Sequence, residues 1–413
     1  MGRRIWTAGM LVLATAASTA VAQPSGETGD AGAAAVPDEP AEGSSGEIGE
    51  LRFGNSAFRF YGFARLDAIY DDSRPDALQT PTFIRSEDPS AGPGGEDSLT
   101  LHPRLTRFGV DLDGPVLDPL GGARLGGKLE IDFQNGGRES RAVPRYRHAY
   151  LTLGWEHSTL LVGQTCDLIY PLYPEVNADT LMWNAGNLGD RRAQVRWTFD
   201  PAGTGLTFAA AAGLTGAVDS QDLDGDGVRD GEDSGVPNLQ ARLGWSRSVG
   251  GGDLAFGLWG YTAREEVQVP VSGETEFESF AAGLDFSVPL PGSLTLRGEL
   301  WTGENLSDVR GGIGQGVNAA TGREIASRGG WAELGWKSGG PYSLYTGATL
   351  DDPDDDDLRP GDRSENSAWY LVQRLDFTGA FRVGLDYLRW TTEYVGLDEG
   401  TDNRLNLYIV YFF

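Results

Sequence analysis

The chain has 413 residues, which is long enough for one large barrel or for two to three ordinary domains. Its formal net charge of -27 argues against a nucleic-acid-binding protein, because such a protein presents a basic surface to the phosphates. The single cysteine, Cys166, excludes an internal disulfide bond, and a mean hydropathy of -0.31 excludes a bundle of transmembrane helices. That value leaves a membrane barrel open, since polar lumen residues dilute the apolar ones.

The N-terminal segment predicts export. Arg3 and Arg4 precede a short apolar run that ends at the small residues 20–22, so residues 1–22 are interpreted as a signal peptide. Residues 23–50 contain no lysine or arginine and are rich in glycine, alanine, proline, serine and acidic residues. Such a composition buries too little apolar surface to fold. We therefore expect residues 23–56 to form a disordered acidic linker in the periplasm.

From residue 57 onward, apolar and polar residues alternate with a period of two, which indicates strands. In the first of these segments, Leu66 and Tyr70 fall on one face, while Arg65 and Asp67 fall on the other. The apolar faces are too continuous to meet water, and the charged faces are too charged for a soluble core. A wall whose apolar face contacts lipid outside and whose charged face contacts water inside explains both faces. About sixteen segments have this pattern and the length that a tilted membrane strand needs, at approximately 57–70, 101–113, 122–134, 144–156, 158–166, 191–200, 204–214, 237–248, 252–263, 275–288, 293–303, 329–338, 341–351, 365–377, 379–391 and 402–413.

The connections between these segments alternate in length. Short turns such as 156–158 and 377–379 are separated by long polar segments at 71–100, 135–143, 167–190, 215–236, 264–274, 304–328, 352–364 and 392–401. Short periplasmic turns and long external loops are typical of outer-membrane barrels. The chain ends on an alternating strand, "LNLYIVYFF", which we expect to pair with the first strand so that no sheet edge remains. The predicted fold is an all-β, antiparallel transmembrane β-barrel over residues 57–413.

The long segment 167–190 is rich in tyrosine, leucine, proline and tryptophan, so it does not resemble a solvated loop. It joins the fifth and sixth predicted strands, the position at which porins fold a loop into the lumen. We predict a constriction loop to which Asp167, Glu175 and Asp179 contribute acidic groups. The alternative is a loop that covers a neighbouring subunit of a trimer.

Basic residues of the first half of the barrel fall on the lumen face. Arg65, Arg107, Lys128 and Arg196 are predicted to lie near mid-height of the wall. Rings of arginine or lysine favour anions, so these residues predict a pore that prefers small anions. The alternative is a static network in which they pair with acidic residues of the same strands.

The long segment 215–236 contains the sequence "DLDGDGVRDGED", which has the spacing of a calcium-binding loop. Positions 1, 3, 5, 7, 9 and 12 are taken by Asp222, Asp224, Asp226, the carbonyl group of Val228, Asp230 and Asp233, and Gly227 stands at the sharp turn. No flanking helices are predicted, so this is not an EF-hand domain. The expected ligand is Ca²⁺, and the alternative is a solvated acidic loop.

The sequence contains no recognisable set of catalytic residues. The three histidines do not accompany a nucleophile elbow, an HExxH motif or a glycine-rich phosphate loop. We expect a protein that is not an enzyme and that requires no cofactor.

Several segments resemble the DcaP-like outer-membrane porin family, namely "FYGFARLDAIYDDSRP", "LTRFGVDLDGP", "YRHAYLTLG", "LLVGQTCDLIYPLYP" and "MWNAGNLGDRR". The similarity covers about residues 58–200. It implies a homotrimeric porin of sixteen strands for small organic acids, with Arg65, Arg107 and Arg196 in segments that match. Many members carry a coiled coil before the barrel, whereas residues 23–50 show no heptad pattern. Cys166 also departs from the family pattern, in which an aromatic residue is common at this position.

These observations together predict an outer-membrane porin for the passive diffusion of small hydrophilic solutes, with a preference for organic anions such as carboxylates. The alternatives are a phosphate- or sugar-selective porin, or a calcium-binding surface or adhesion barrel. The expected partners are outer-membrane lipid, lipopolysaccharide, small solutes and two further copies of the chain.

Overall fold

The computed structural model describes residues 50–92, 95–134, 141–176 and 179–413. The predicted signal peptide and most of the predicted linker lie outside these residues. In the described part of the chain, no helix is both long and apolar enough to cross a membrane.

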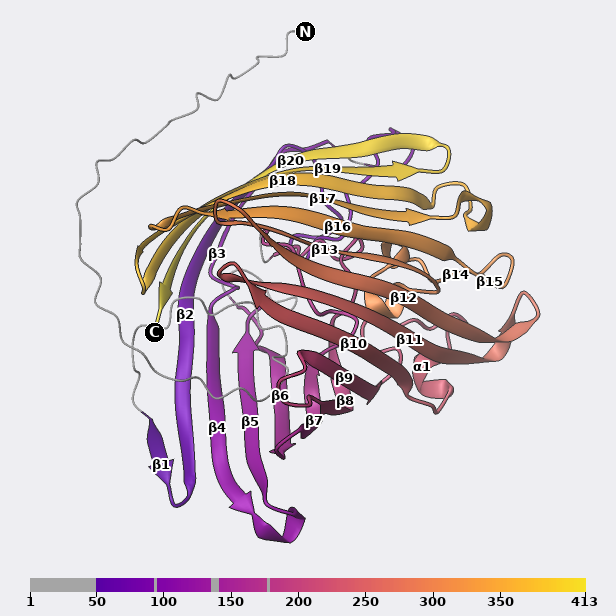
Figure 1. The fold of residues 1–413 in the computed structure, drawn as a ribbon. Helices are drawn as coiled ribbons and strands as arrows, with labels where there is room; N and C mark the ends of the chain where they lie inside the picture. Colours follow the sequence, from indigo (N-terminus) through magenta and orange to yellow (C-terminus); the bar gives the residue numbers. More distant parts are fainter. Residues whose placement is uncertain (1–49, 93–94, 135–140, 177–178) are drawn as a thin grey trace. The chain divides into compact units, whose positions relative to one another are not determined.

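One antiparallel sheet of eighteen strands makes up the described structure (Figure 1). The strands of this sheet are β1 (Leu51–Phe53), β2 (Ser56–Asp71), β3 (Ser98–His102), β4 (Arg107–Leu117), β5 (Ala123–Asp132), β6 (Arg145–Gly154), β7 (Ser158–Cys166), β8 (Arg191–Phe199), β9 (Leu206–Gly213), β10 (Asn238–Val249), β11 (Gly252–Val271), β12 (Glu274–Leu290), β13 (Leu294–Glu304), β16 (Ala326–Lys337), β17 (Tyr342–Pro353), β18 (Arg363–Thr378), β19 (Phe381–Tyr394) and β20 (Leu397–Phe412). A separate hairpin pairs β14 (Val317–Asn318) with β15 (Arg323–Glu324). The short helices are η1 (Asp118–Leu120), α1 (Asp230–Asp233), η2 (Ser307–Val309), η3 (Gly312–Gly314) and η4 (Asp355–Asp357).

The sheet closes on itself because the last strand pairs with the first. In the register of β2 and β20, Ala64 lies opposite Tyr411 and Ala68 lies opposite Leu407. The backbone groups of Gly62 and Phe413 exchange two hydrogen bonds of 3.0 Å each. Both β3 and β4 pair with β2, β3 along residues 67–71 and β4 along residues 57–63. The two segments therefore follow each other along the same edge of β2 and count as one strand of the barrel. Without the short edge strand β1, the described residues therefore form a closed barrel of sixteen strands, which confirms the predicted fold.

Strand β1 falls within the predicted linker and corrects its boundary. Leu51 lies opposite Phe58, so β1 covers the part of β2 that extends beyond the end of β20. Without β1, this edge of β2 would expose backbone groups that have no hydrogen-bond partner. The three residues of β1 provide these partners.

Side chains alternate across the wall as the sequence predicts. On β20, Leu405, Leu407 and Ile409 are 42–51% exposed on the outer face, whereas Arg404 and Asn406 are 3% and 1% exposed on the inner face. The outer face is apolar, and the inner face carries the polar and charged groups, as expected for a barrel that separates lipid from a polar lumen.

Two predicted external loops are wrong. Residues 264–274 and 392–401 are largely strand, because β11 and β12 meet in a tight turn, as do β19 and β20. Ser272 and Gly273 in the first turn have positive φ angles of 52° and 98°. Such angles are typical of two-residue hairpin turns. The outward-facing side chains of these extensions, such as Arg264 and Glu266, are charged, so the apolar alternation that indicates a membrane strand is lost there.

Candidate functional site

Residues 167–190, which we call the inner loop, are buried along most of their described length. Their acidic side chains bind arginines on widely separated strands. Asp167 binds Arg192 of β8 at 2.8 Å, and Asp179 binds Arg404 of β20 at 2.9 Å. Between these two points, Glu175 binds Arg297 of β13 at 2.9 Å and also binds Arg374 of β18. In the order of the sheet, β8 lies far from β13, β18 and β20 in both directions around the barrel, so the inner loop crosses the lumen.

The backbone of the inner loop is held by the same wall. The N–H groups of Leu172 and Glu175 donate to the carboxylates of Glu299 at 2.9 Å and Glu333 at 2.8 Å. The indole N–H of Trp301 donates to the carbonyl group of Gly186 at 2.7 Å. Each bond satisfies a polar group that would otherwise be buried without a partner. The loop is therefore fixed at many points and does not move as a free flap.

Apolar side chains of the inner loop pack into two clusters, which combine wall residues with residues of other loops. Val176, Met182 and Ala185 join a cluster with Ile84, Tyr345, Ala368, Tyr370, Val372, Leu388 and Trp390. Ile169 and Leu188 join a second cluster with Trp259, Tyr261, Ala263, Ala281, Trp301, Leu306 and Val309. The apolar composition of residues 167–190 thus has its explanation in burial against the inner face of the barrel.

A second segment, residues 305–325, also folds against the inner loop, which the sequence analysis did not foresee. Its Asp308 binds Arg192 at 2.6 Å, and its Arg310 binds Asp190 of the inner loop at 2.8 Å. The N–H of Gly189 donates to the carbonyl group of Val309 at 2.7 Å. The apolar residues Leu306, Val309 and Ile313 within a polar segment were the signal that could have revealed this burial.

A cavity of about 70 Å³ lies between the inner loop and strands β2, β4 and β18–β20. Four arginines but only two carboxylates line it, and aromatic side chains complete its wall. The lining residues are Phe63, Arg65, Arg107, Tyr173, Pro174, Glu175, Val176, Leu181, Arg374, Arg382, Asp386, Tyr408, Val410 and Phe412. The side chains that line the space beside the inner loop therefore include more arginines than carboxylates.

Each of these arginines lies over an aromatic ring. The guanidinium of Arg65 is 4.1 Å from the ring centre of Tyr408, that of Arg107 is 5.0 Å from Phe63, that of Arg374 is 5.1 Å from Tyr345, and that of Arg382 is 5.5 Å from Phe412. Cation–π contact of this kind holds a guanidinium flat against the wall. The rings thus position the arginines without neutralising their charge.

Each arginine also has a carboxylate partner. Arg65 donates to both oxygens of Asp67 at 2.7 and 2.9 Å, Arg382 donates to Asp376 at 2.6 Å, and Arg107 lies 3.4 Å from Glu130. The predicted alternative of a paired network is therefore present. A guanidinium carries five N–H donors, so one carboxylate leaves capacity for a transient anion.

The structure brings together three of the residues predicted for the pore, Arg65, Arg107 and Glu175, which line one cavity. The other four lie elsewhere. Asp167 and Asp179 anchor the inner loop, and Lys128 lies 3.7 Å from Asp111 and over the ring of Tyr61. Arg196 donates to the side chain of Gln194 and to the carbonyl group of Cys166, so it secures the end of β7.

Sequence reasoning missed Arg374 and Arg382 as cavity residues. Both fall on the polar face of strands that were predicted correctly. Their positions in the alternation of apolar and polar residues indicate that both side chains face the lumen. The sequence does not indicate that β18 and β19 lie beside the inner loop.

Glu175 lies outside the membrane-spanning strands, and its ionisation follows from its neighbours. Burial opposes the charged form, but the positive charges of Arg374 and Arg297 outweigh it and lower the pKa of Glu175 to about 2. The carboxylate is therefore ionised at neutral pH, as the anchoring role requires.

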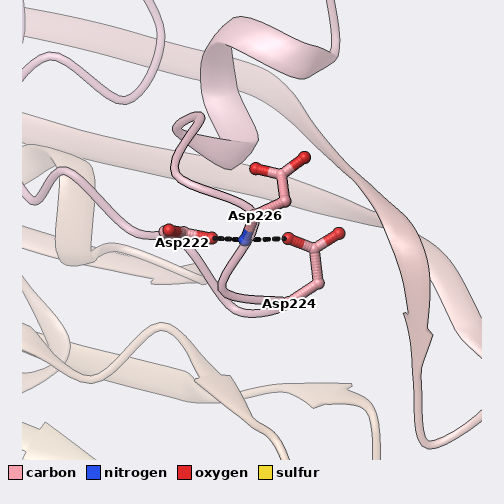
Figure 2. Close-up of side chains that lie close together, drawn as sticks. All are labelled: Asp222, Asp224 and Asp226. Carbon is pink, nitrogen blue, oxygen red and sulfur yellow. Dashed lines mark hydrogen bonds between the residues drawn. The ribbon is translucent and has the colours of Figure 1, made fainter.

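The calcium-like segment gathers only part of its predicted ligand set. Ligand atoms of Asp222, Asp224 and Asp226 lie within 4.8 Å of one another, as Figure 2 shows. Asp222 accepts hydrogen bonds from the N–H groups of Gly225 at 2.8 Å and Gly227 at 3.1 Å, so the loop is wound around this carboxylate. Of the other predicted carboxylate ligands, Asp230 and Asp233 are not part of this group.

Asp230 has a different role in the structure. Its carboxylate is buried and accepts a hydrogen bond from the N–H of Leu223 at 3.1 Å. Burial raises the pKa of Asp230 to about 6. The side chain therefore closes the base of the loop. The prediction that this segment binds Ca²⁺ remains a prediction.

The fold is similar to those of solved outer-membrane channels. The structure of the channel DcaP of Acinetobacter baumannii has a TM-score of 0.71 at 18% identity, over 87% of this chain and 98% of the other. An anion-selective porin from Comamonas acidovorans has a TM-score of 0.55 at 13% identity, over 87% of this chain and 100% of the other. The trimer form of OmpT of Vibrio cholerae has a TM-score of 0.52 at 15% identity, over 87% and 99% of the two chains.

A scan against protein-family models finds no match, and a search of the curated proteins finds none either. The resemblance to DcaP-like porins is confirmed at the level of the fold. The expectation that the protein is not an enzyme remains a prediction.

Proposed function

We propose that this barrel is a porin of the outer membrane, through which small hydrophilic solutes diffuse passively with a preference for organic anions such as carboxylates. The observation that carries the proposal is the cavity beside the inner loop, where four arginines face two carboxylates. The barrel fold shared with solved porins supports the channel, and the apolar outer face supports the membrane location.

The chemistry of the cavity suits weak, transient binding of a carboxylate. A guanidinium offers two parallel N–H groups to a carboxylate, which is why arginine favours this class of anion. Because each arginine already shares its charge with a carboxylate of the wall, a passing anion meets competition and is released. Conduction requires this balance, since a solute must enter the site and also leave it.

The first test measures ion selectivity. We expect the refolded barrel, inserted into a planar bilayer under a gradient of potassium chloride, to give a reversal potential with the sign of an anion-preferring pore. The arginine excess at the cavity is the physical reason. A reversal potential of the opposite sign would refute the anion preference, and a barrel without conductance would refute the porin.

A homotrimer is the proposed assembly, and the likeness to a barrel solved in a trimer form supports it. Outer-membrane lipid and lipopolysaccharide would surround the remaining outer wall, whose exposed leucine, valine and aromatic side chains suit acyl chains.

We also propose that the external loop binds Ca²⁺ through Asp222, Asp224 and Asp226, which have ligand atoms within 4.8 Å of one another. Oxygen ligands of this kind suit a hard divalent cation. Replacing Asp224 and Asp226 together with asparagine should remove one calcium site in titration calorimetry of the folded barrel. The matched control replaces the exposed Asp355 and Asp356, which lack the ligand spacing, and should leave calcium binding unchanged. Equal calcium binding by the Asp224/Asp226 variant and the wild type would rule the loop site out.

A further inference from the structure

Three buried side chains near the external end of β11 each carry an oxygen atom without a hydrogen-bond partner. They are Glu265 of β11, Ser279 of β12 and Asn305, which follows β13, and each is 1% exposed. The unpartnered atoms are Oε1 of Glu265, Oγ of Ser279 and Oδ1 of Asn305. Buried polar atoms in folded proteins nearly always have a partner, so each of these oxygen atoms calls for a group that the protein itself does not supply.

Side-chain hydrogen bonds and the strand register relate these three side chains to one another. The amide of Asn305 donates to Oε2 of Glu265 at 2.9 Å, and the amide of Gln221 donates to the same oxygen at 3.0 Å. Ser279 lies opposite Ala263, while Phe277 lies opposite Glu265, so Ser279 and Glu265 are diagonal neighbours on the inner face of adjacent strands. Diagonal neighbours on one face of a sheet are within reach of long side chains.

The charge of Glu265 is not balanced by a base. Among the described residues, no arginine, lysine or histidine forms an ion pair with it. Arg192, which acts on the neighbouring Asp219, is already engaged by Asp167 at 2.8 Å and by Asp308 at 2.6 Å. An ionised carboxylate buried in this way is costly unless a cation or hydrogen-bond donors compensate it.

A second acidic group adds further negative charge near Glu265. Asp219, in the external loop before α1, accepts a hydrogen bond from the hydroxyl group of Ser307 at 2.6 Å. Burial and the negative charge of Asp308 raise the pKa of Asp219, and together they outweigh the hydrogen bond from Ser307 and the positive charge of Arg192. The region around Glu265 therefore attracts cations.

We propose that Glu265, Ser279 and Asn305 form an internal calcium site, with Asp219 supplying further negative charge from the external side. The donor set consists of a carboxylate, a hydroxyl group and an amide carbonyl, all of them hard oxygen ligands. Ca²⁺ accepts neutral oxygen ligands in flexible arrangements, whereas Mg²⁺ demands a near-ideal octahedron and keeps several waters. This site is separate from the carboxylates of Asp222, Asp224 and Asp226.

The site occupies a position that matters for the lumen. Asn305 begins the segment 305–325, which supports the inner loop through the bond between Val309 and Gly189 and through the ion pair of Arg310 with Asp190. A bound ion would tie the start of this segment to β11 and β12. Calcium would then stabilise the wall of the pore from the inside.

The test uses the full barrel in detergent, with the external loop site removed by Asp224→Asn and Asp226→Asn in every sample. After treatment with a chelator, we expect titration calorimetry with calcium chloride to detect one remaining site. Terbium should bind in its place and show luminescence when aromatic side chains are excited, because Tyr261 lies four residues from Glu265 on the same face of β11.

Adding Glu265→Gln should abolish the remaining site, since it removes the charge but keeps the shape of the side chain. The matched control is Glu278→Gln, on the outer face of β12 and exposed, which should leave binding intact. Adding Ser279→Ala should weaken the affinity for calcium. Resistance of the folded band to detergent in unheated gels confirms that each variant is folded. No calcium site in the Asp224/Asp226 background, or a site that survives Glu265→Gln, would overturn the proposal.

Discussion

Replacing Glu175 with glutamine should loosen the inner loop and raise the single-channel conductance. The carboxylate of Glu175 binds Arg297 at 2.9 Å and also binds Arg374, and all three groups are largely buried. Arg297 keeps its ion pair with Glu333 at 2.7 Å, but Arg374 loses its carboxylate partner. Leaving one charge of a buried ion pair uncompensated costs roughly 3–5 kcal/mol. The loop should then sample positions away from β13 and β18, so we expect larger conductance and more current noise.

The control for this variant is Glu156→Gln in a periplasmic turn. The side chain of Glu156 is 88% exposed and lies 3.6 Å from His157, so its removal should change neither conductance nor noise. Glu175→Asp keeps the charge on a shorter side chain and should fall between the wild type and Glu175→Gln. Identical current records for Glu175→Gln and the wild type would show that the other contacts of the loop suffice.

Acidification gives an independent view of the same anchor. The pKa of Glu175 is lowered from 4.5 to about 2, so the folded state favours the ionised carboxylate. The stabilisation is fully present above the unfolded pKa and is lost as the pH falls through the folded pKa. The contribution of Glu175 should thus weaken below about pH 4.5 and vanish only near pH 2, and it should be missing at every pH in Glu175→Gln.

The strands of the barrel could be predicted from the sequence because each one has a recognisable local pattern of apolar and polar residues. A lipid-facing residue such as Leu407 alternates with a lumen-facing residue such as Asn406, and a period of two is visible without knowing the partner strand. The signal failed where the strands leave the membrane. At Arg264 the outer face is charged as well, so a strand and a polar loop have the same appearance in sequence.

The contacts of the inner loop, in contrast, could not be predicted from local sequence patterns. Its apolar composition predicted burial, but its anchors depend on residues that are far away in the chain. Glu175 and Arg374 are 199 residues apart, and Asp179 and Arg404 are 225 residues apart. Such pairs follow from the closure of the barrel and the register of its strands, which no local pattern encodes. Asp179 was therefore interpreted as a pore charge, although its carboxylate is engaged by the wall.

Replacing Arg65 and Arg382 together with glutamine should abolish the anion preference or reverse it. Both side chains line the cavity, on β2 and β19, and neither one binds the inner loop in the way that Arg374 does. Their removal leaves Asp67 and Asp376 without their arginine partners and leaves Asp386 beside them. Among the lining side chains, four arginines against two carboxylates become two arginines against two carboxylates, while Asp67 and Asp376 are no longer paired with arginine. The excess of arginine that concentrates anions is therefore lost.

The size of this effect follows from Coulomb's law. A unit charge at 4 Å contributes about 1 kcal/mol even at the dielectric constant of water, and about 1.4 kcal/mol corresponds to a tenfold change in an equilibrium constant. Two lost charges should therefore lower the ratio of chloride to potassium permeability by about tenfold or more, as measured by the reversal potential under a salt gradient. The matched control is Arg389→Gln, because Arg389 lies on the outer face of β19 and is exposed. If the double variant kept the wild-type reversal potential while Arg389→Gln altered it, the selectivity would reside outside the cavity, and the assignment of the arginines as the anion path would be wrong.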